Sequence, residues 1–531
     1  MSTQNTSEAD ERSHNLATQG TVVATFTMVS RISGLVRDVF FSYLLGASHF
    51  ADIFLVAFRI PNFFRRMFAE GAFNQAFVPV LVRFKTQGHA ELLAFLAPLS
   101  GIFSAVMMLV VVLGLLLAPQ LAFIFAPGFA DYPHRLEQTA ALVYVTFPYL
   151  ALISLTAYAG AVLNAHNQFA VPAATPVLLN LVLIGAAVLA VPLNDGFQQI
   201  QFLAWGVLAA GFIQLAFQMP SMARLGVLTP PTLNHRHEGV RRVGRLLVPA
   251  LFASSVGQIN ALVNTILAST LITGSISWLY YADRLLELPV GLVAIALSTV
   301  MLPHLSRLAS EGEVAWFQHT VTWGINVGLM LCLPAAVALY LMADGLIATI
   351  FMSFTGGAMT PYDARMAGLA LEMFAVALPG FVLVRVLSPA FFAHEDTRTP
   401  FRCAMGSVAA NLLVSLATFS WFGHVGLAWA TAIAAWTNVI LLYFALKRHG
   451  LYVTDSSLWP LLWRTVVASI LLAGALALVQ SQTAWLEQSP MERLVGIVVI
   501  VGVGLVGYLI VLLLLGVRPK HLNHYSATQG Q

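Results

Sequence analysis

Five arginines stand within the first two hydrophobic stretches of this sequence, and no other residues in it are better suited to chemistry. They are Arg31, Arg37, Arg59, Arg65 and Arg66. A Lys or Arg at membrane depth costs about 3 kcal/mol even on lenient insertion scales, so such side chains normally face a water-filled cavity or a partner. Only the acids Asp38, Asp52 and Glu70 lie in the same stretches. We therefore expect a cationic cavity that binds an anionic cargo.

The choice of arginine narrows the kind of anion. A planar guanidinium donates paired hydrogen bonds that match phosphate or carboxylate oxygens, so it suits a diphosphate better than lysine would. On a helical projection, the polar residues of the second stretch fall within a stripe of about 120°, which is typical of a cavity wall. Arg65 lies to one side of this stripe, and Pro61 is expected to kink the helix. The stripe consists of Asp52, Arg59, Asn62, Arg66, Glu70 and Asn74.

Two further groups of polar residues lie inside apolar stretches. In the first stretch, Arg31, Gly34 and Asp38 share a helical face, and Arg37 lies beside it. The eighth stretch carries Tyr280, Asp283, Arg284 and Glu287, of which the first, third and fourth share a face.

A purely structural role stays open for several of these side chains. Arg37 could pair with Asp38, and Arg284 with Asp283 or Glu287, which would simply hold helices together. Arg65 and Arg66 could instead extend to a membrane interface. The excess of arginines over acids favours a cavity for the group as a whole.

Membrane helices must position these side chains, because almost the whole chain is apolar. Of its 531 residues, 59% are hydrophobic and 9% are charged, and the mean hydropathy is +0.82. We predict an all-α multi-pass membrane protein with about fourteen transmembrane helices of roughly 20 residues each. No connecting segment is long enough for a separate soluble enzyme domain. The spans are expected near 20–46, 51–82, 92–118, 138–163, 171–192, 201–221, 245–271, 278–305, 316–342, 364–392, 401–422, 425–446, 459–480 and 492–516.

The distribution of basic residues predicts the orientation. With the N-terminus inside, the inner loops and ends collect 16 Lys and Arg residues, whereas the outer side collects Arg135, Arg365 and Arg493. Basic residues accumulate on the cytoplasmic side of membrane proteins. We therefore expect a multi-pass membrane protein with both termini in the cytoplasm.

A weak internal repeat divides the chain into two lobes. Ala165-His166 followed by Pro172 recurs 228 positions later as Ala393-His394 followed by Pro400. A parallel repeat of six spans fits a transporter whose two lobes rock about a central site. The predicted parts are a disordered cytoplasmic tail (1–20), an N-terminal lobe of spans 1–6 (21–222), a basic cytoplasmic loop (223–243), a C-terminal lobe of spans 7–12 (244–447), spans 13–14 (448–517) and a cytoplasmic tail (518–531).

Motifs for other chemistry are absent or weak. The sequence has no Walker loop, no H-E-x-x-H motif and no plausible Ser-His-Asp set. Gly502, Gly504 and Gly507 match a dinucleotide pattern but lie inside an apolar span with no strand before them, so helix packing explains them better. Cys332 and Cys403 are expected to be buried packing residues. We therefore expect no metal site, no cofactor, no catalysis and no nucleic-acid partner.

Several motifs resemble the MurJ (MviN) lipid II flippases, which belong to the multidrug/oligosaccharidyl-lipid/polysaccharide exporter superfamily. The similarity rests on the runs Ser30–Asp38 (SRISGLVRD), Arg59–Phe73 (RIPNFFRRMFAEGAF), Ala126–Phe129 (APGF) and Ser277–Leu285 (SWLYYADRL). It extends through all fourteen predicted spans, and the second run is far more specific than a short site pattern.

The resemblance implies two six-helix lobes around a central cavity, with two C-terminal helices that build a groove for a lipid tail. It implies transport of lipid II, the undecaprenyl-diphosphate-linked peptidoglycan precursor, from the inner to the outer leaflet of the bacterial cytoplasmic (inner) membrane. By motif, the substrate-binding positions are Arg31, Arg37, Asp52, Arg65, Arg66 and Arg284. Supporting polar positions matched in the same way are Asn62, Glu70, Ser277 and Glu287, and we add Arg59 and Asp283 from their places in the polar stretches.

The combined hypothesis is a flippase that works by alternating access, with lipid II and membrane lipids as partners. The leading alternative is an exporter of another lipid-linked oligosaccharide, of the O-antigen type, which the arginines alone do not exclude. A drug-cation exporter would favour acids over arginines, and a membrane scaffold would not need uncompensated arginines within its spans. The energy source stays open among membrane potential, protons and a monovalent cation such as sodium, and protein partners are not predicted.

Overall fold

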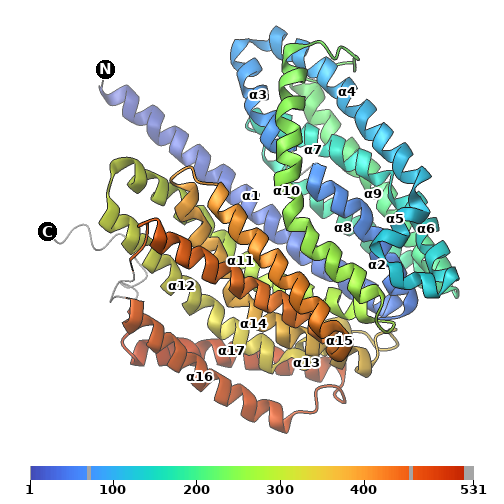
Figure 1. The fold of residues 1–531 in the computed structure, drawn as a ribbon, viewed down its shortest axis with the longest axis vertical. Helices are drawn as coiled ribbons and strands as arrows, with labels where there is room; N and C mark the ends of the chain where they lie inside the picture. The colour runs from blue at the N-terminus through green and yellow to red at the C-terminus, as the bar shows by residue number, and fades with distance from the viewer. Residues whose placement is uncertain (1, 69–72, 454–457, 519–531) are drawn as a thin grey trace. The chain divides into compact units, whose positions relative to one another are not determined.

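The computed structural model describes residues 2–68, 73–453 and 458–518, with the side chains of 2–19, 252–257, 294–296 and 298–299 left out. Over these residues the chain forms helices and no strands (Figure 1), which confirms the all-α prediction. The chain divides into two compact units, Met1–Thr270 and Leu271–Gln531. The first unit contains α1 (Ser2–Leu45), α2 (His49–Arg65), α3 (Phe73–Gln87), α4 (His89–Leu116), α5 (Ala118–Phe125), the 3-10 helix η2 (Pro127–Asp131), α6 (Pro133–Thr146), α7 (Tyr149–Ala165), α8 (Ala170–Ala190), α9 (Gly196–Arg224) and α10 (Glu238–Ser269). The second contains α11 (Ser275–Glu311), α12 (Val314–Leu341), α13 (Ala343–Phe351), α14 (Pro361–Phe392), α15 (Arg398–Arg448), α16 (Leu458–Gln482) and α17 (Pro490–Leu514).

Nine helical segments in the described part of the chain are long and apolar enough to cross a membrane. One of them, α15, contains two predicted spans, because Gly423 interrupts it with non-helical backbone (φ 57°, ψ −135°). Its two arms fold back on each other (Figure 1), and Ser407 Oγ donates a hydrogen bond to the Ala434 carbonyl over 2.7 Å. The break falls between the predicted spans 401–422 and 425–446.

The other four predicted spans also coincide with helices, namely α1, α2 with α3, α10 and α11. The hydrophobic parts of α1 and α11 each carry three charged residues. Charge at membrane depth is what makes these helices candidates for function, and it is also what lowers their apolar character. The structure is thus consistent with about fourteen spans.

Local sequence signals explain where several helices begin. α14 and α17 each start with a capping box, Thr360 with Asp363 and Ser489 with Glu492, and each has a proline in its first turn. In such a box the hydroxyl and the acid satisfy backbone N–H groups that have no partner within the helix. Ser48 caps α2 by accepting a hydrogen bond from the Ala51 N–H.

Two features of the first unit differ from the prediction. Helix α1 begins at Ser2, so residues predicted to form a disordered tail are helical. This tail lacks proline and has no glycine before Gly20, so a helix nucleated in the membrane can extend through it without a new nucleation cost. In α2, the α-helical winding ends at Arg65 and changes to wider π-type winding over residues 66–68. The projected polar stripe therefore does not run as one α-helix from Asp52 to Asn74, and Glu70 lies outside the described residues.

The first compact unit ends later in the chain than the N-terminal lobe predicted from the sequence repeat. Helix α10, the seventh predicted span, packs against α3, α4, α5 and η2 of the first unit. Gly128 marks one close approach, where its N–H donates to Ser269 Oγ over 3.1 Å and an added Cβ would lie 2.2 Å from the Ser269 carbonyl oxygen. The first unit thus extends to Thr270, one span beyond the lobe at 21–222.

The local geometry supports the repeat at its best-matched point. Among the described residues, Asn167 and Glu395 are the non-glycine positions with positive φ, both at 59°, and they lie 228 positions apart. Each of them directly follows a histidine, His166 or His394. In both histidines Nδ1 lies within hydrogen-bond distance of the carbonyl oxygen four residues earlier. The same helix-ending turn therefore occurs in both halves of the sequence.

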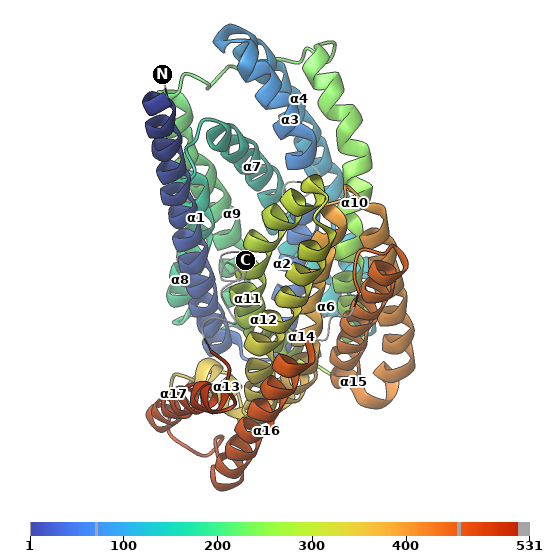
Figure 2. The ribbon, with the colours of Figure 1, turned by 90° about the vertical axis from the view of Figure 1, so that its left-hand side faces the viewer.

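The last two helices, α16 and α17, pack against the other helices of the second unit. Figure 2 shows α16 and α17 beside α12 and α13, and two apolar clusters join these helices. Tyr508 donates a hydrogen bond to the Met330 carbonyl over 2.8 Å, and the buried Arg493 donates to the Met352 carbonyl over 2.9 Å. The predicted lipid-tail groove along these helices stays a prediction.

Candidate functional site: two groups of arginines

Arg37 is the most enclosed of the five N-terminal arginines. Only 5% of its surface is exposed, and its Nε and Nη2 donate to Asp38 Oδ1 over 2.9 and 2.7 Å. Its Nη1 donates to Asn180 Oδ1 of α8 over 3.1 Å, and the Asn180 amide in turn donates to the Ser30 carbonyl and the Ser33 hydroxyl of α1. Through these hydrogen bonds the Arg37 guanidinium holds α1 against α8. This arrangement fits the structural alternative, in which Arg37 pairs with Asp38 and holds helices together.

Aromatic rings complete the surroundings of Arg37. Its Cζ lies 5.4 Å from the ring centroid of Phe41 and 5.8 Å from that of Phe58 on α2. A cation over an aromatic face gains about 0.5–2 kcal/mol, more where water is excluded. Arg31 lies on the same helix, half-buried and nearer the N-terminus.

The polar residues of α2 occupy three environments. Asp52 is buried in the first turn, where a negative charge is favoured by the helix dipole. Arg59 is half-buried and its Nη1 donates to the hydroxyl of Thr265 on α10, 206 positions away in sequence. Arg65 turns back along its own helix, where Nε donates to Asn62 Oδ1 over 3.0 Å and the Asn62 amide donates to the Phe58 carbonyl.

Arg66 differs from its neighbours because its side chain is exposed. Its backbone N–H caps α2 by donating to the carbonyls of Asn62 and Phe63. The helix therefore fixes the Arg66 backbone at the start of the π-type turn, a kind of winding that is frequent at functional sites. An exposed guanidinium on a fixed backbone is able to contact an anionic ligand.

The second unit carries its own arginine site on α11. Arg284 Nη1 donates to Glu287 Oε2 over 2.7 Å, and Nη2 donates to the Tyr280 hydroxyl over 3.2 Å. The Tyr280 ring centroid lies 5.3 Å from Arg284 Cζ. These contacts confirm that the three residues share one face. The Arg284 and Glu287 side chains keep 26% and 43% of their surface exposed, so the oriented guanidinium is still accessible.

Two other predicted positions of α11 have opposite environments. Ser277 is fully buried, whereas Asp283 is exposed and lies off the Arg284 face. Next to Ser277, the Trp278 indole donates to Asp363 Oδ1 of α14 over 3.0 Å, which positions the start of α11. Ser277 thus belongs to the packed end of the helix.

Sequence reasoning missed two partners of the arginines, Asn180 and Thr265. Asn180 is the one amide residue in the span 171–192, and that isolation within an apolar run was a usable signal. Thr265 gave no such signal, because the hydroxyl of a threonine in a membrane helix usually donates a hydrogen bond to the backbone of its own helix. Thr265 does so too, donating to the Ala261 carbonyl over 2.6 Å.

Within each unit the arrangement suits anion binding without bond chemistry. Over the described residues, no cluster of three or more His, Cys, Asp or Glu side chains could hold a metal ion. Arg37 and Arg59 serve contacts between helices, whereas Arg66 and Arg284 present accessible guanidinium groups. Accessible guanidinium groups favour ligands with phosphate or carboxylate oxygens.

Comparisons with known proteins identify the family. Residues 41–496 match the family described as "Lipid II flippase MurJ". The Vibrio cholerae protein named "Probable lipid II flippase MurJ" is 39% identical over 523 residues, covering 96% of this chain and 98% of that protein. The Burkholderia cenocepacia protein named "Lipid II flippase MurJ" is 35% identical over 479 residues, covering 89% and 92%.

Solved structures agree on the fold. A structure titled "Lipid II flippase MurJ, inward closed conformation" matches with a TM-score of 0.77 at 24% identity, covering 92% of this chain and 97% of that one. An inward-facing multidrug transporter of the MATE family and the MOP superfamily matches with a TM-score of 0.62 at 13% identity, covering 81% and 98%. The similarity predicted from the sequence motifs is thus confirmed, and this chain belongs to the MurJ family of lipid II flippases.

Proposed function

We propose that this chain is a flippase that moves lipid II from the inner to the outer leaflet of the bacterial cytoplasmic membrane by alternating access. The observation that carries the proposal is the family match over residues 41–496, which includes the arginines of α2 and Arg284. The activity is transport for cell-wall synthesis. No covalent bond forms or breaks, so the chain is a transporter and not an enzyme.

The arginines divide the work between binding and support. Arg66 and Arg284 contact the diphosphate, because each has an accessible guanidinium that can donate to two oxygens at once. Tyr280 and Glu287 orient Arg284, because they accept hydrogen bonds from its terminal nitrogens. Of the other predicted substrate-binding residues, Arg31, Arg65 and Asp52 keep that role in the proposal. Arg37, also predicted to bind substrate, is instead assigned a supporting role because it ties α1 to α8.

The two ends of the chain lie in the cytoplasm. This proposal rests on the excess of basic residues in the inner loops and on the even number of predicted spans.

The prenyl tail stays in the bilayer throughout, because exposing a long hydrocarbon chain to water would cost about 0.8 kcal/mol of free energy per methylene.

Energy for directional transport would come from the membrane potential, protons or a monovalent cation. Moving one elementary charge through 100 mV is worth about 2.3 kcal/mol, and a diphosphate cargo carries negative charge. No cofactor is required for this coupling.

The alternative cargo is an O-antigen-type lipid, which shares the diphosphate and would bind to the same arginines. The family match favours lipid II over this alternative.

Alanine variants of Arg66 and Arg284 test the proposal. Each should lose transport while still inserting in the membrane, because a charge-assisted contact contributes about 1.5–3 kcal/mol and its loss weakens binding tenfold or more. Lysine should rescue only in part, since it keeps the charge without the paired donors. The measurements are growth of a strain with no other flippase, the amount of protein in the membrane, and the fraction of lipid II exposed on the outer leaflet.

Arg83→Ala is the matched control. Arg83 lies on the surface of α3 in an exposed ion pair with Glu238, and such pairs contribute little, so growth should be normal. Normal growth of both Arg66→Ala and Arg284→Ala strains would mean that these arginines do not bind the cargo.

A further inference from the structure

A groove on the surface of the second unit is lined by apolar side chains from α12, α14 and α15. It has a volume of about 180 Å³, and its lining includes Leu383, Leu387, Trp436, Ile440, Tyr443 and Phe444. Ile440 and Phe444 are exposed by 51% and 64%, so the groove faces outward. We call this feature the Tyr443 groove.

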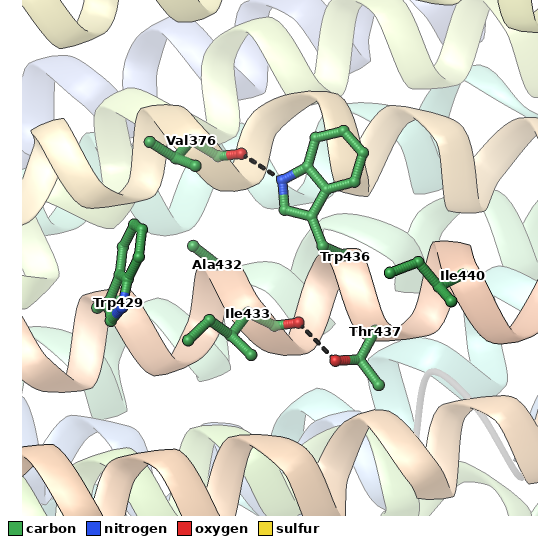
Figure 3. A pocket seen from close by; sticks show the side chains of 7 residues that line it. All are labelled: Val376, Trp429, Ala432, Ile433, Trp436, Thr437 and Ile440. Atoms are coloured by element: carbon green, nitrogen blue, oxygen red, sulfur yellow. Dashed lines mark hydrogen bonds between the residues drawn. The ribbon is translucent and has the colours of Figure 1, made fainter.

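A second cavity of about 180 Å³ shares Trp436 and Ile440 with the Tyr443 groove. Figure 3 shows two hydrogen bonds in its lining: the Trp436 indole donates to the Val376 carbonyl over 2.9 Å, and the Thr437 hydroxyl donates to the Ile433 carbonyl over 2.8 Å. With its N–H committed in this way, the Trp436 indole is held in place where it lines both cavities. The side chains that line the Tyr443 groove are predominantly apolar, so hydrocarbon is the expected content.

Positive charge stands at one end of the Tyr443 groove. Lys447 Nζ lies 5.6 Å from the ring centroid of Tyr443, and Arg448 follows in the last turn of α15. Both side chains are exposed. Basic side chains in the last turn of a helix lie where a bilayer places its phosphates.

The dimensions suit a lipid chain of one leaflet. From Lys447 to Trp436 the helix rises about 16 Å at 1.5 Å per residue. This length is close to the thickness of half the hydrocarbon core of a bilayer, which is about 15 Å. A longer prenyl chain would meet Trp436 at the inner end. The Tyr452 hydroxyl, also in the lining, accepts a hydrogen bond from Thr322 over 3.3 Å.

We propose that the Tyr443 groove binds one acyl chain of an anionic glycerophospholipid, whose phosphate contacts Lys447 and Arg448. The apolar lining holds the chain and the two basic residues select the negative headgroup. This lipid is distinct from the cargo, and its site involves none of the arginines assigned to cargo binding.

Native mass spectrometry of the full-length purified chain tests the proposal. Phosphatidylglycerol and phosphatidylcholine with identical acyl chains are added to delipidated protein without lipid II. Phosphatidylglycerol should bind at least fivefold more strongly, because each basic residue near a phosphate contributes about fivefold. Lys447→Ala with Arg448→Ala should remove that preference. Ile440→Trp should fill the groove and lower the binding of both lipids.

Two controls keep the result specific. Arg241→Ala with Arg242→Ala removes another exposed basic pair, and Leu413→Trp adds an indole to another exposed position of α15. Neither should change lipid binding at this site. Equal binding of the two lipids by the unchanged protein, or equal losses in variants and controls, would overturn the proposal. Displacement of phosphatidylglycerol by added lipid II in the wild type but not in Ile440→Trp would assign the groove to the cargo tail instead. Loss of flippase activity in Arg66→Ala bears on none of these readouts.

Discussion

Arginine has different roles at different positions in this protein, and its partners distinguish them. Arg37 donates to Asp38 and Asn180 and is buried, so its charge is used inside the fold. Arg66 is exposed and Arg284 is oriented by Tyr280 and Glu287 while still accessible. Composition alone would assign the same role to all three.

Replacing Arg37 should destabilise the protein, whereas replacing Arg66 should not. Removing one partner of a buried ion pair costs about 3–5 kcal/mol, because the other charge remains in an apolar environment. Arg37→Leu should therefore lower the midpoint of thermal unfolding of the purified protein well below that of Arg66→Ala. The double variant Arg37→Leu with Asp38→Leu should recover part of the loss.

Equal unfolding midpoints for Arg37→Leu and Arg66→Ala would contradict the supporting role of Arg37. In that case Arg37 would be a cargo residue like Arg66, and its variant would lose transport without losing stability.

At the scale of elements, glycine decides where one long helix becomes two spans. Gly423 adopts φ 57° and ψ −135°, a conformation that residues with a Cβ avoid. A Cβ built at Gly423 meets no atom within 4 Å, so only the backbone would resist a substitution there. Gly426 follows, and close contact with Thr418 packs the two arms of α15 together.

Gly423→Ala should destabilise the second unit by about 1–3 kcal/mol, the usual cost of a strained backbone conformation. Gly474→Ala is the matched control, because Gly474 also has open space around its Cα but lies inside helix α16. Alanine there should be neutral or stabilising by about 0.5–1 kcal/mol. Thermal unfolding of both variants measures the difference, and a Gly423→Ala protein as stable as the wild type would rule out backbone strain at the kink.

At the level of the whole molecule, the two C-terminal helices α16 and α17 add to the packing of the second unit. They pack on α12 and α13 through apolar clusters and through the contacts of Tyr508 and Arg493 with backbone carbonyls. This packing supports a stabilising role, and it is compatible with the predicted groove for the lipid tail.

A chain shortened to end at Leu446 should insert in the membrane but transport little lipid II, because the prenyl tail would lose its apolar path. Arg493→Ala separates this effect from stability, since it removes a buried contact of α17 and leaves both helices in place. We expect Arg493→Ala to unfold at a lower temperature yet to transport normally per folded molecule. Full transport by the stably inserted short chain would exclude the groove.

Features that depend on neighbouring residues were predictable from the amino-acid sequence. Span lengths follow from the apolar runs, and the cost of membrane charge singled out the arginines. The Arg284 group was predictable because residues three and four apart share a helical face. The break near Gly423 was predictable because the apolar runs stop on either side of it.

Contacts between residues far apart in the sequence became visible in the folded structure. Asn180 lies 143 positions from Arg37, and Thr265 lies 206 positions from Arg59, so no local pattern could pair them. The packing of α10 on the first unit, the π-type turn at Arg66 and the Tyr443 groove likewise depend on how whole helices fit together. Helix packing depends on the shapes of many side chains at once, and the periodicity of one segment does not contain that information.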